Sequence, residues 1–330
     1  MSPGLPSERA PLRREAPPPE SRLDRAYRLY RRRIGRCRTE NQLNRIHIAL
    51  ENYMTPAEVR HFAAALAGDA PDSPSRRWIA RLDGAMPVKR ARPVEFERKA
   101  VLKGVSLYTA GIGSADQKTL IIGLAGRFLR LMLPTPWVLD CLNPALYDVL
   151  LMRDFSRLCF ALGMPGLGGD VFEALSSLRR HVDPRAYRNA MSLGTSGGGA
   201  PAVIAAILLD LDRGIAISPQ DFHRDADPLK TRSGNGDPYA ELLASRPRRF
   251  PELVLVCGAD HQSDAAVATA MHGLVPSQLW KVKNCAQHGV FKWHLARGTL
   301  PALLAKVLGQ SLENRTLVAT GLRPPTGHRY

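Results

Sequence analysis

Strand-like runs alternate with helix-like runs over most of this chain, from about residue 100 to residue 310. Such alternation is typical of crossover connections, which build a largely parallel sheet covered by helices on both faces. Several of the strand-like runs are mostly apolar, as expected for strands buried on both sides. We therefore predict an α/β fold. The expected strands are Val105–Thr109, Leu120–Leu124, Asp148–Met152, Asn189–Leu193, Ile215–Ser218, Leu253–Cys257 and Leu279–Val282, and the expected helices are Trp137–Leu142, Val171–His181, Pro201–Leu209, Ala240–Leu243, Asp264–His272 and Trp293–Leu308.

The first hundred residues follow a different pattern. Apolar residues recur at helical spacing between residues 23 and 53. Thr55, Pro56 and Glu58 then form the pattern of a capping box with proline in the first turn, which predicts a helix that starts there. We expect four parts: a disordered tail (1–20), a basic helical module (21–100), the α/β domain (101–315) and a C-terminal tail (316–330).

Positive charge is concentrated in the first of these regions. The chain has 46 Lys and Arg against 30 Asp and Glu, a net charge of +16. Residues 1–103 contribute 22 basic and 12 acidic residues, or +10, which leaves +6 for the rest. Such a surface favours an anionic partner, although a merely solvated arginine-rich face is the alternative. Nucleic-acid binding is disfavoured, because the helices show no recognition motif and no series of stacking aromatic residues.

Cysteine spacing and composition narrow the class of protein further. The five cysteines show no CxxC spacing, which favours reduced thiols in a cytoplasmic protein. The beginning of the chain lacks the apolar stretch of a secretory signal, and no apolar run is long enough to span a membrane. Histidines show no metal-ligand spacing, and no dinucleotide fingerprint follows a strand, so we expect neither a metal nor a cofactor.

The glycine-rich stretch Gly194–Gly199 lies between a strand-like run and an alanine-rich, helix-like run. Gly194, Ser196 and Gly198 fill the pattern G-x-S-x-G, which in this context places a serine on a sharp, strained turn. Such a turn needs neighbours without side chains, and the helix that follows presents unpaired N–H groups. A plain glycine-rich turn or a phosphate-binding loop is the alternative, although the lysine of a P-loop is absent.

The order of the elements around Ser196 resembles the α/β-hydrolase fold over about residues 100–310. Segments 147–154, 163–170 and 218–220 further resemble a poorly characterised group of bacterial α/β-hydrolases, some of them associated with cell-surface glycans. The resemblance implies a mostly parallel central sheet with helices on both faces. It also implies a triad in the order serine, acid, histidine.

The resemblance assigns roles to single residues. Ser196 is the expected nucleophile, and His288, in a loop after the last strand, is the expected base. A histidine suits this role because its pKa lies near the operating pH. His294 is the alternative base, but we expect it to be packed or exposed on the closing helix.

The acid is expected after the strand Leu253–Cys257. Asp264 is favoured over Asp260 because it precedes a helix-like run, and Asp221 is a remote third choice. The acid would hold the imidazole tautomer through an ionised hydrogen bond, and the other aspartate would cap the helix.

Two backbone N–H groups are expected to form an oxyanion hole. One belongs to Gly197 and the other to Gly126 or Arg127, on the loop after an apolar strand. Arg127 could also bind an anionic group of the substrate; the alternatives are that it is solvated or paired with Asp154.

Two further loops are of interest. The Gly/Pro-rich loop 163–169 either borders the mouth of the site or leads into a helix capped by Asp170. The irregular segment 221–238 is the best candidate for a lid or insertion.

Together these features predict a serine hydrolase that cleaves or transfers an acyl group through an acyl-enzyme. The preferred subclass is an esterase or deacylase that acts on a small-molecule ester, a glycan-linked ester or another anionic substrate. The alternative is a catalytically silent hydrolase scaffold that acts as a binding protein in bacterial surface-glycan assembly.

Overall fold

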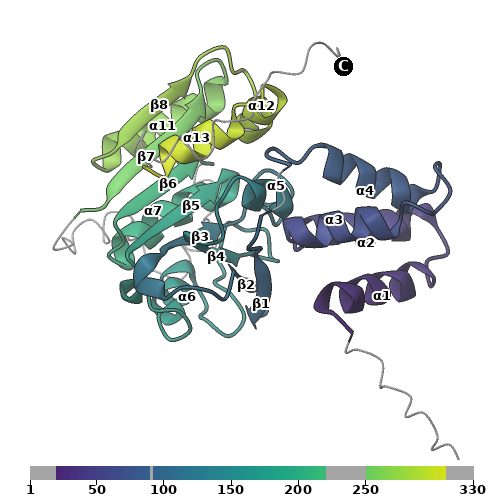
Figure 1. Ribbon diagram of the computed structural model, residues 1–330. Coiled ribbons are helices and arrows are strands. Elements are labelled where there is room, and N and C mark those ends of the chain that lie inside the picture. The colour runs from purple at the N-terminus through teal and green to yellow at the C-terminus, as the bar shows by residue number, and fades with distance from the viewer. Residues whose placement is uncertain (1–19, 90–91, 221–249, 310–330) are drawn as a thin grey trace, which may run out of the picture.

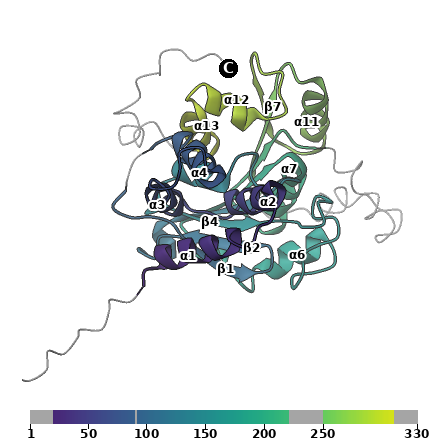
Figure 2. The same cartoon turned by 90° about the vertical axis from the view of Figure 1, so that its right-hand side faces the viewer.

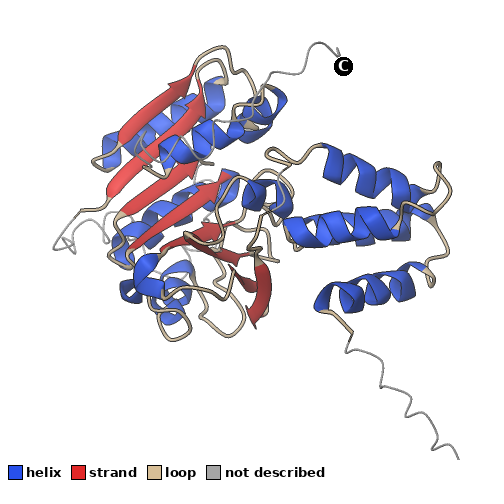
Figure 3. Ribbon diagram, in the orientation of Figure 1, coloured by secondary structure: helices blue, strands red, loops and turns tan. Residues whose placement is uncertain are grey.

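The computed structural model describes residues 20–89, 92–220 and 250–309 (Figure 1). Its centre is an eight-stranded sheet in the spatial order β1-β2-β4-β3-β5-β6-β7-β8 (Figure 3). β2 pairs antiparallel with β1 and β4, and the remaining neighbours in the sheet are parallel. The strands are β1 (Glu97–Leu102), β2 (Val105–Thr109), β3 (Thr119–Leu124), β4 (Tyr147–Met152), β5 (Asn189–Thr195), β6 (Arg213–Ile217), β7 (Glu252–Gly258) and β8 (Gln278–Val282).

All seven predicted strands are confirmed, and β1 is the strand that the sequence did not predict. β1 lies at the edge of the sheet and carries Glu97, Arg98 and Lys99 in succession, all exposed. Charged side chains at a sheet edge prevent pairing with another chain. They also replace the alternation of apolar and polar residues from which a strand is predicted. β1 spans residues 100 and 101, where the sequence placed a domain boundary; the division into domains stays a prediction.

Helices cover both faces of the sheet. α6 (Val171–Leu178), α7 (Gly199–Leu208) and α11 (Gln262–Leu274) pack on one face, and α5 (Thr135–Asp140), α12 (Val290–Ala296) and α13 (Leu300–Val307) on the other. Alternate residues of β3 divide between the two cores: Leu120 and Ile122 belong to the first, and Ile121 to the second. This period of two explains why the predicted strands are apolar throughout.

The sequence predicted one continuous closing helix, Trp293–Leu308, and this prediction is wrong. The structure has two helices there, α12 and α13, with a break between them. Gly298 in the break has φ +66°, a left-handed conformation that ends a helix, and Pro301 lies in the first turn of α13. The predicted helix Ala240–Leu243 lies outside the described residues, as do the predicted lid 221–238, the C-terminal tail and residues 1–19 of the N-terminal tail.

The N-terminal module consists of α1 (Arg22–Ile34), α2 (Glu40–Glu51), α3 (Pro56–Ala65) and α4 (Pro74–Gly84). Figure 2 views the molecule from the side of this module. The predicted capping box is confirmed: Thr55 Oγ1 accepts from the Glu58 N–H, and Glu58 accepts from the Thr55 N–H. A separate apolar core holds the module together, and Trp137 of α5 packs against it while its Nε1 donates to the Leu82 carbonyl at 2.8 Å.

Candidate active site

A sharp turn joins β5 to α7 and carries Ser196. The serine has φ +54°, in the left-handed region where a non-glycine residue costs about 1–3 kcal/mol. A Cβ at Gly194 would overlap the Gly198 carbonyl and lie 2.7 Å from Cβ of Ala202; one at Gly198 would overlap the Leu124 carbonyl. The turn can therefore close only with glycine at both positions, and this is the strand–turn–helix geometry that the motif predicts.

Three side chains from distant parts of the sequence meet at this turn. His288, between β8 and α12, places Nε2 2.9 Å from Oγ of Ser196. Its Nδ1 lies 2.9 and 2.8 Å from the two carboxylate oxygens of Asp264, which lies in the first turn of α11 after β7. When Nδ1–H donates to the carboxylate, Nε2 accepts from the serine hydroxyl, as a general base must.

The strand order and these three positions decide the fold. A serine on a strained turn after β5, with an acid after β7 and a histidine after β8, follows the chain order of one fold family. The chain has the α/β-hydrolase fold.

Comparisons with known proteins find similar chains among solved structures. No model of a known protein family matches, and no curated protein matches. Similar solved structures include an α/β-hydrolase enzyme from the metagenome of lagoon sediments of Mar Chica, Morocco, with 19% identity, 67% of this chain and 99% of that chain covered, and a TM-score of 0.41. A dienelactone hydrolase from Anabaena variabilis has 13% identity over 67% of this chain and 100% of its own, with a TM-score of 0.41. A hyperthermophilic esterase from the archaeon Pyrobaculum calidifontis has 13% identity over 73% and 91%, with a TM-score of 0.45.

The alternatives for the acid and the base lie in different surroundings. The Asp260 side chain is exposed, whereas Asp264 is 5% exposed and meets His288. His294 instead directs Nδ1 to Oγ1 of Thr299 at 2.8 Å, and burial lowers its pKa. Asp221, the third candidate acid, lies outside the described residues.

One neighbour of Asp264 was missed by the sequence analysis. Nδ1 of His261, the residue that caps α11, lies 3.1 Å from Oδ1 of Asp264, and its ring centroid lies 5.9 Å from that of His288. A histidine three residues before the acid at a helix start was the available signal. Its position brings a second imidazole beside the buried carboxylate.

The loop after β3 lies against the serine. A Cβ at Gly126 would stand 3.2 Å from Cβ of Ser196, and one at Gly197 would stand 3.7 Å from Cγ of Arg127. The N–H of Gly126 donates to the Arg130 carbonyl at 3.1 Å. Of the two residues predicted on this loop, Gly126 therefore has its N–H engaged within the loop itself.

Other predicted residues have structural roles. Asp154 accepts hydrogen bonds from the N–H groups of Ser156, Leu158 and Phe160, so its carboxylate shapes its own loop. Asp170 caps α6 by accepting from the Glu173 N–H at 2.9 Å, which confirms the capping interpretation. That the loop 163–169 borders the site stays a prediction.

Two side chains to which the sequence analysis gave no role lie beside Gly197: Cys159, which is buried, and Gln220, which is half-buried. A Cβ at Gly197 would stand 2.6 Å from Sγ of Cys159 and 3.4 Å from Oε1 of Gln220. The Gln220 N–H also donates to the Ser196 carbonyl at 3.2 Å. Gln220 belongs to segment 218–220, which carries the resemblance, but the sequence gave neither residue a place beside Gly197.

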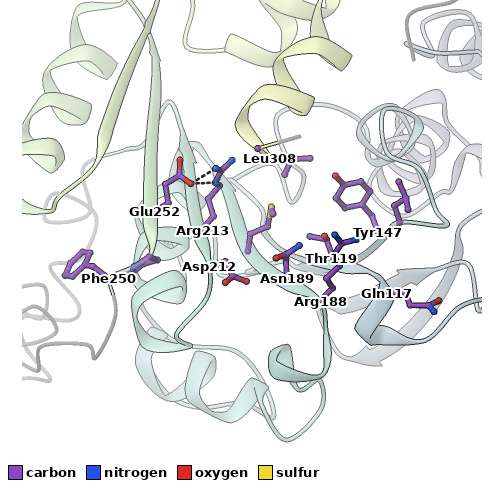
Figure 4. A pocket seen from close by; sticks show the side chains of 14 residues that line it. Gln117, Thr119, Tyr147, Arg188, Asn189, Asp212, Arg213, Phe250, Glu252 and Leu308 are labelled. Carbon is purple, nitrogen blue, oxygen red and sulfur yellow. Dashed lines mark hydrogen bonds and ion pairs between the residues drawn. The ribbon is translucent and has the colours of Figure 1, made fainter. Parts of the chain in front are cut away.

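One hollow of the described chain lies away from this site. It has a volume of about 650 Å³ and is drawn in Figure 4. Its lining includes Thr119, Asn189 and Arg213, the first residues of β3, β5 and β6, whereas Ser196 follows the end of β5. The hollow therefore lies at the opposite edge of the sheet. In the part of the chain that the structure describes, no three potential metal ligands cluster, and no helix is both long and apolar enough to cross a bilayer.

Proposed function

We propose that this protein is a serine hydrolase with Ser196 as nucleophile, His288 as general base and Asp264 as the acid of the triad. The observation that carries the proposal is the continuous hydrogen-bonded path from Oγ of Ser196 through the imidazole to a carboxylate that is 5% exposed. A serine hydroxyl is a weak nucleophile unless an adjacent base activates it, and the base must itself be oriented by a third group. This arrangement meets both requirements.

The reaction follows from the geometry. Nε2 of His288 takes the hydroxyl proton as Oγ of Ser196 attacks the ester carbonyl, and Asp264 stabilises the imidazolium that forms. The tetrahedral intermediate collapses, the C–O bond to the alcohol breaks, and His288 returns the proton to the departing oxygen. Water then loses a proton to His288 and attacks the acyl-enzyme, which releases the acid and restores the serine.

The developing oxyanion would lie between Gly197 and the loop after β3. The Gly197 N–H follows the serine at the start of the turn into α7. Because the Gly126 N–H is engaged with Arg130, we assign the second donor to the Arg127 N–H. Each such donor is worth about 2.7–4 kcal/mol in comparable enzymes.

The substrate class is a small-molecule or glycan-linked ester with an anionic group. The Arg127 side chain lies beside Gly197, so its guanidinium is the group that we assign to a negative charge on the substrate. The glycan preference rests on the sequence resemblance in segments 147–154, 163–170 and 218–220. The competing function, a silent scaffold for surface-glycan assembly in a bacterial cytoplasm, shares the fold and differs in needing no active serine.

The helical module offers a surface for an anionic partner. Between residues 22 and 45 the chain has nine arginines and two acidic residues. The exposed side chains on this surface that form no ion pair with any described residue are Arg32, Arg33, Arg36, Arg38 and Arg45. Guanidinium groups bind carboxylates and phosphates through charge-assisted hydrogen bonds, and this attraction weakens as the salt concentration rises.

The proposal is tested with a fluorophosphonate probe and p-nitrophenyl esters of graded chain length. Wild type should be labelled and active, Ser196→Ala should be neither, and Ser114→Ala, a change at an exposed serine, should behave like wild type. Failure of the folded wild type to react with the probe, or full activity in Ser196→Ala, would refute the proposal and favour the scaffold.

A further inference from the structure

The loop of residues 125–134, between β3 and α5, is held in a strained conformation. Leu129 and Met132 have φ of +62° and +59°, in the left-handed region that disfavours side chains. Such residues persist only where the surroundings hold them. Buried Leu131 and Leu133 anchor the loop to one face of the sheet, and Gly126 lies against Ser196. The remaining support comes from outside the hydrolase sheet.

The end of α2 in the N-terminal module supplies that support. Nδ2 of Asn52 donates to the Phe128 carbonyl at 3.2 Å, and Oγ1 of Thr135 donates to the Asn52 carbonyl at 2.8 Å. Oε2 of Glu51 accepts from Nη1 of Arg130 at 3.0 Å. Glu51 and Asn52 are 6% and 5% exposed, so these hydrogen bonds are shielded from water and strengthened by the low local dielectric.

The residues that brace the loop are themselves fixed. Oε1 of Glu51 accepts from Nε1 of Trp78 at 3.2 Å and from Nη2 of Arg81 at 2.8 Å, both on α4. Arg153, fully buried at the end of β4, donates to the Asn52 carbonyl, and its guanidinium lies 4.2 Å from the ring centroid of Tyr53. The end of α2 is thus tied to both the module and the sheet.

We propose that the helical module is a positioning element of the active site. Glu51 and Asn52 hold the loop so that the Arg127 N–H points at the oxyanion formed on Ser196. The link is direct, because the Arg130 carbonyl accepts from the Gly126 N–H while the Arg130 side chain is held by Glu51. This inference rests on the proposed function, and it gives the module a role in the reaction rather than only in stability.

The test measures ester hydrolysis by Asn52→Leu and Glu51→Gln, two changes that nearly preserve side-chain volume. We expect kcat to fall about tenfold, a fraction of the roughly 10²–10³-fold loss caused by removing an oxyanion donor, with KM little changed. The inhibition constant of an alkyl trifluoromethyl ketone, which forms an oxyanion with the serine, should rise by the same factor. Ser73→Ala is the matched control, since it removes the cap of α4 and destabilises the module without touching the loop. Its melting temperature should fall while kcat stays at the wild-type value.

The outcomes separate this inference from the proposed function. If Ser196→Ala is inactive while folded Asn52→Leu and Glu51→Gln keep wild-type kcat, only the inference is overturned. A loss of kcat without a matching loss of ketone affinity also overturns it, as does an equal loss in Ser73→Ala. If Ser196→Ala stays active, both fail. Should Asn52→Leu not fold, Glu51→Gln decides.

Discussion

Gly194→Ala tests whether the turn itself is required. The new Cβ would lie 2.7 Å from Cβ of Ala202, and ordinary contact begins at 3.4 Å, so the turn must open by at least 0.7 Å there and by more at the Gly198 carbonyl. Overpacking of this kind costs about 1–3 kcal/mol. A displacement near 1 Å at the nucleophile lowers the rate by about 10²-fold. We therefore expect lower stability and a lower kcat/KM together.

The matched control is the same substitution at Gly273. A Cβ there meets nothing within 4 Å, and the residue lies within α11. Alanine in a helix is favoured over glycine by about 1 kcal/mol, so Gly273→Ala should raise the denaturation midpoint and leave activity unchanged. Urea unfolding and ester hydrolysis measure both quantities. Wild-type kcat/KM in Gly194→Ala would refute the steric argument for the turn.

Three further predictions concern the acid, the module and its charge. Asp264→Asn should lower kcat by about 10⁴-fold because the amide selects the wrong tautomer, whereas Asp260→Asn should be near wild type; the reverse result would exchange their roles. Burial lowers the pKa of His47 from 6.5 to about 4. As the pH falls from about 6.5 to about 4, the unfolded chain therefore binds a proton at His47 that the folded chain does not bind. Stability should drop by at most about 1.4 kcal/mol per pH unit there, and urea midpoints of His47→Gln should vary less with pH; equal slopes would contradict this. The double variant Arg32→Ser with Arg36→Ser should elute from a heparin column at lower salt, and unchanged elution would argue against an anionic partner at this surface.

The sequence predicted what local pattern and element order encode. The apolar runs located seven strands, and the G-x-S-x-G pattern located Ser196 on its turn. It favoured Asp264 over Asp260 but left both open, because both follow β7 and the choice depends on where the first turn of α11 meets the loop after β8. The break at Gly298 had a signal in Gly298 and Pro301 that helical periodicity obscured.

Contacts between distant parts of the chain could not be predicted from local sequence patterns. Asn52 and the Phe128 carbonyl are 76 positions apart, and Glu51 and Arg130 are 79 positions apart. Each residue on its own is an ordinary polar side chain near a helix end or in a loop. These residues meet only because α2 packs beside the sheet. Residue spacing in the sequence therefore could not predict the two hydrogen bonds.

Arg153 has a consequence for how easily the helical module can move away from the sheet. Its buried guanidinium is enclosed by the Asn52 carbonyl, the Tyr53 ring and the hydroxyl of Tyr108. Moving the module away from the sheet would separate the Arg153 guanidinium from the Asn52 carbonyl and the Tyr53 ring. Losing a hydrogen bond to a charged group costs more free energy than losing one between neutral groups. Outward movement of the four helices would therefore cost free energy, and we expect ester hydrolysis not to depend on it. A cross-link that locks the module to the sheet should leave turnover intact.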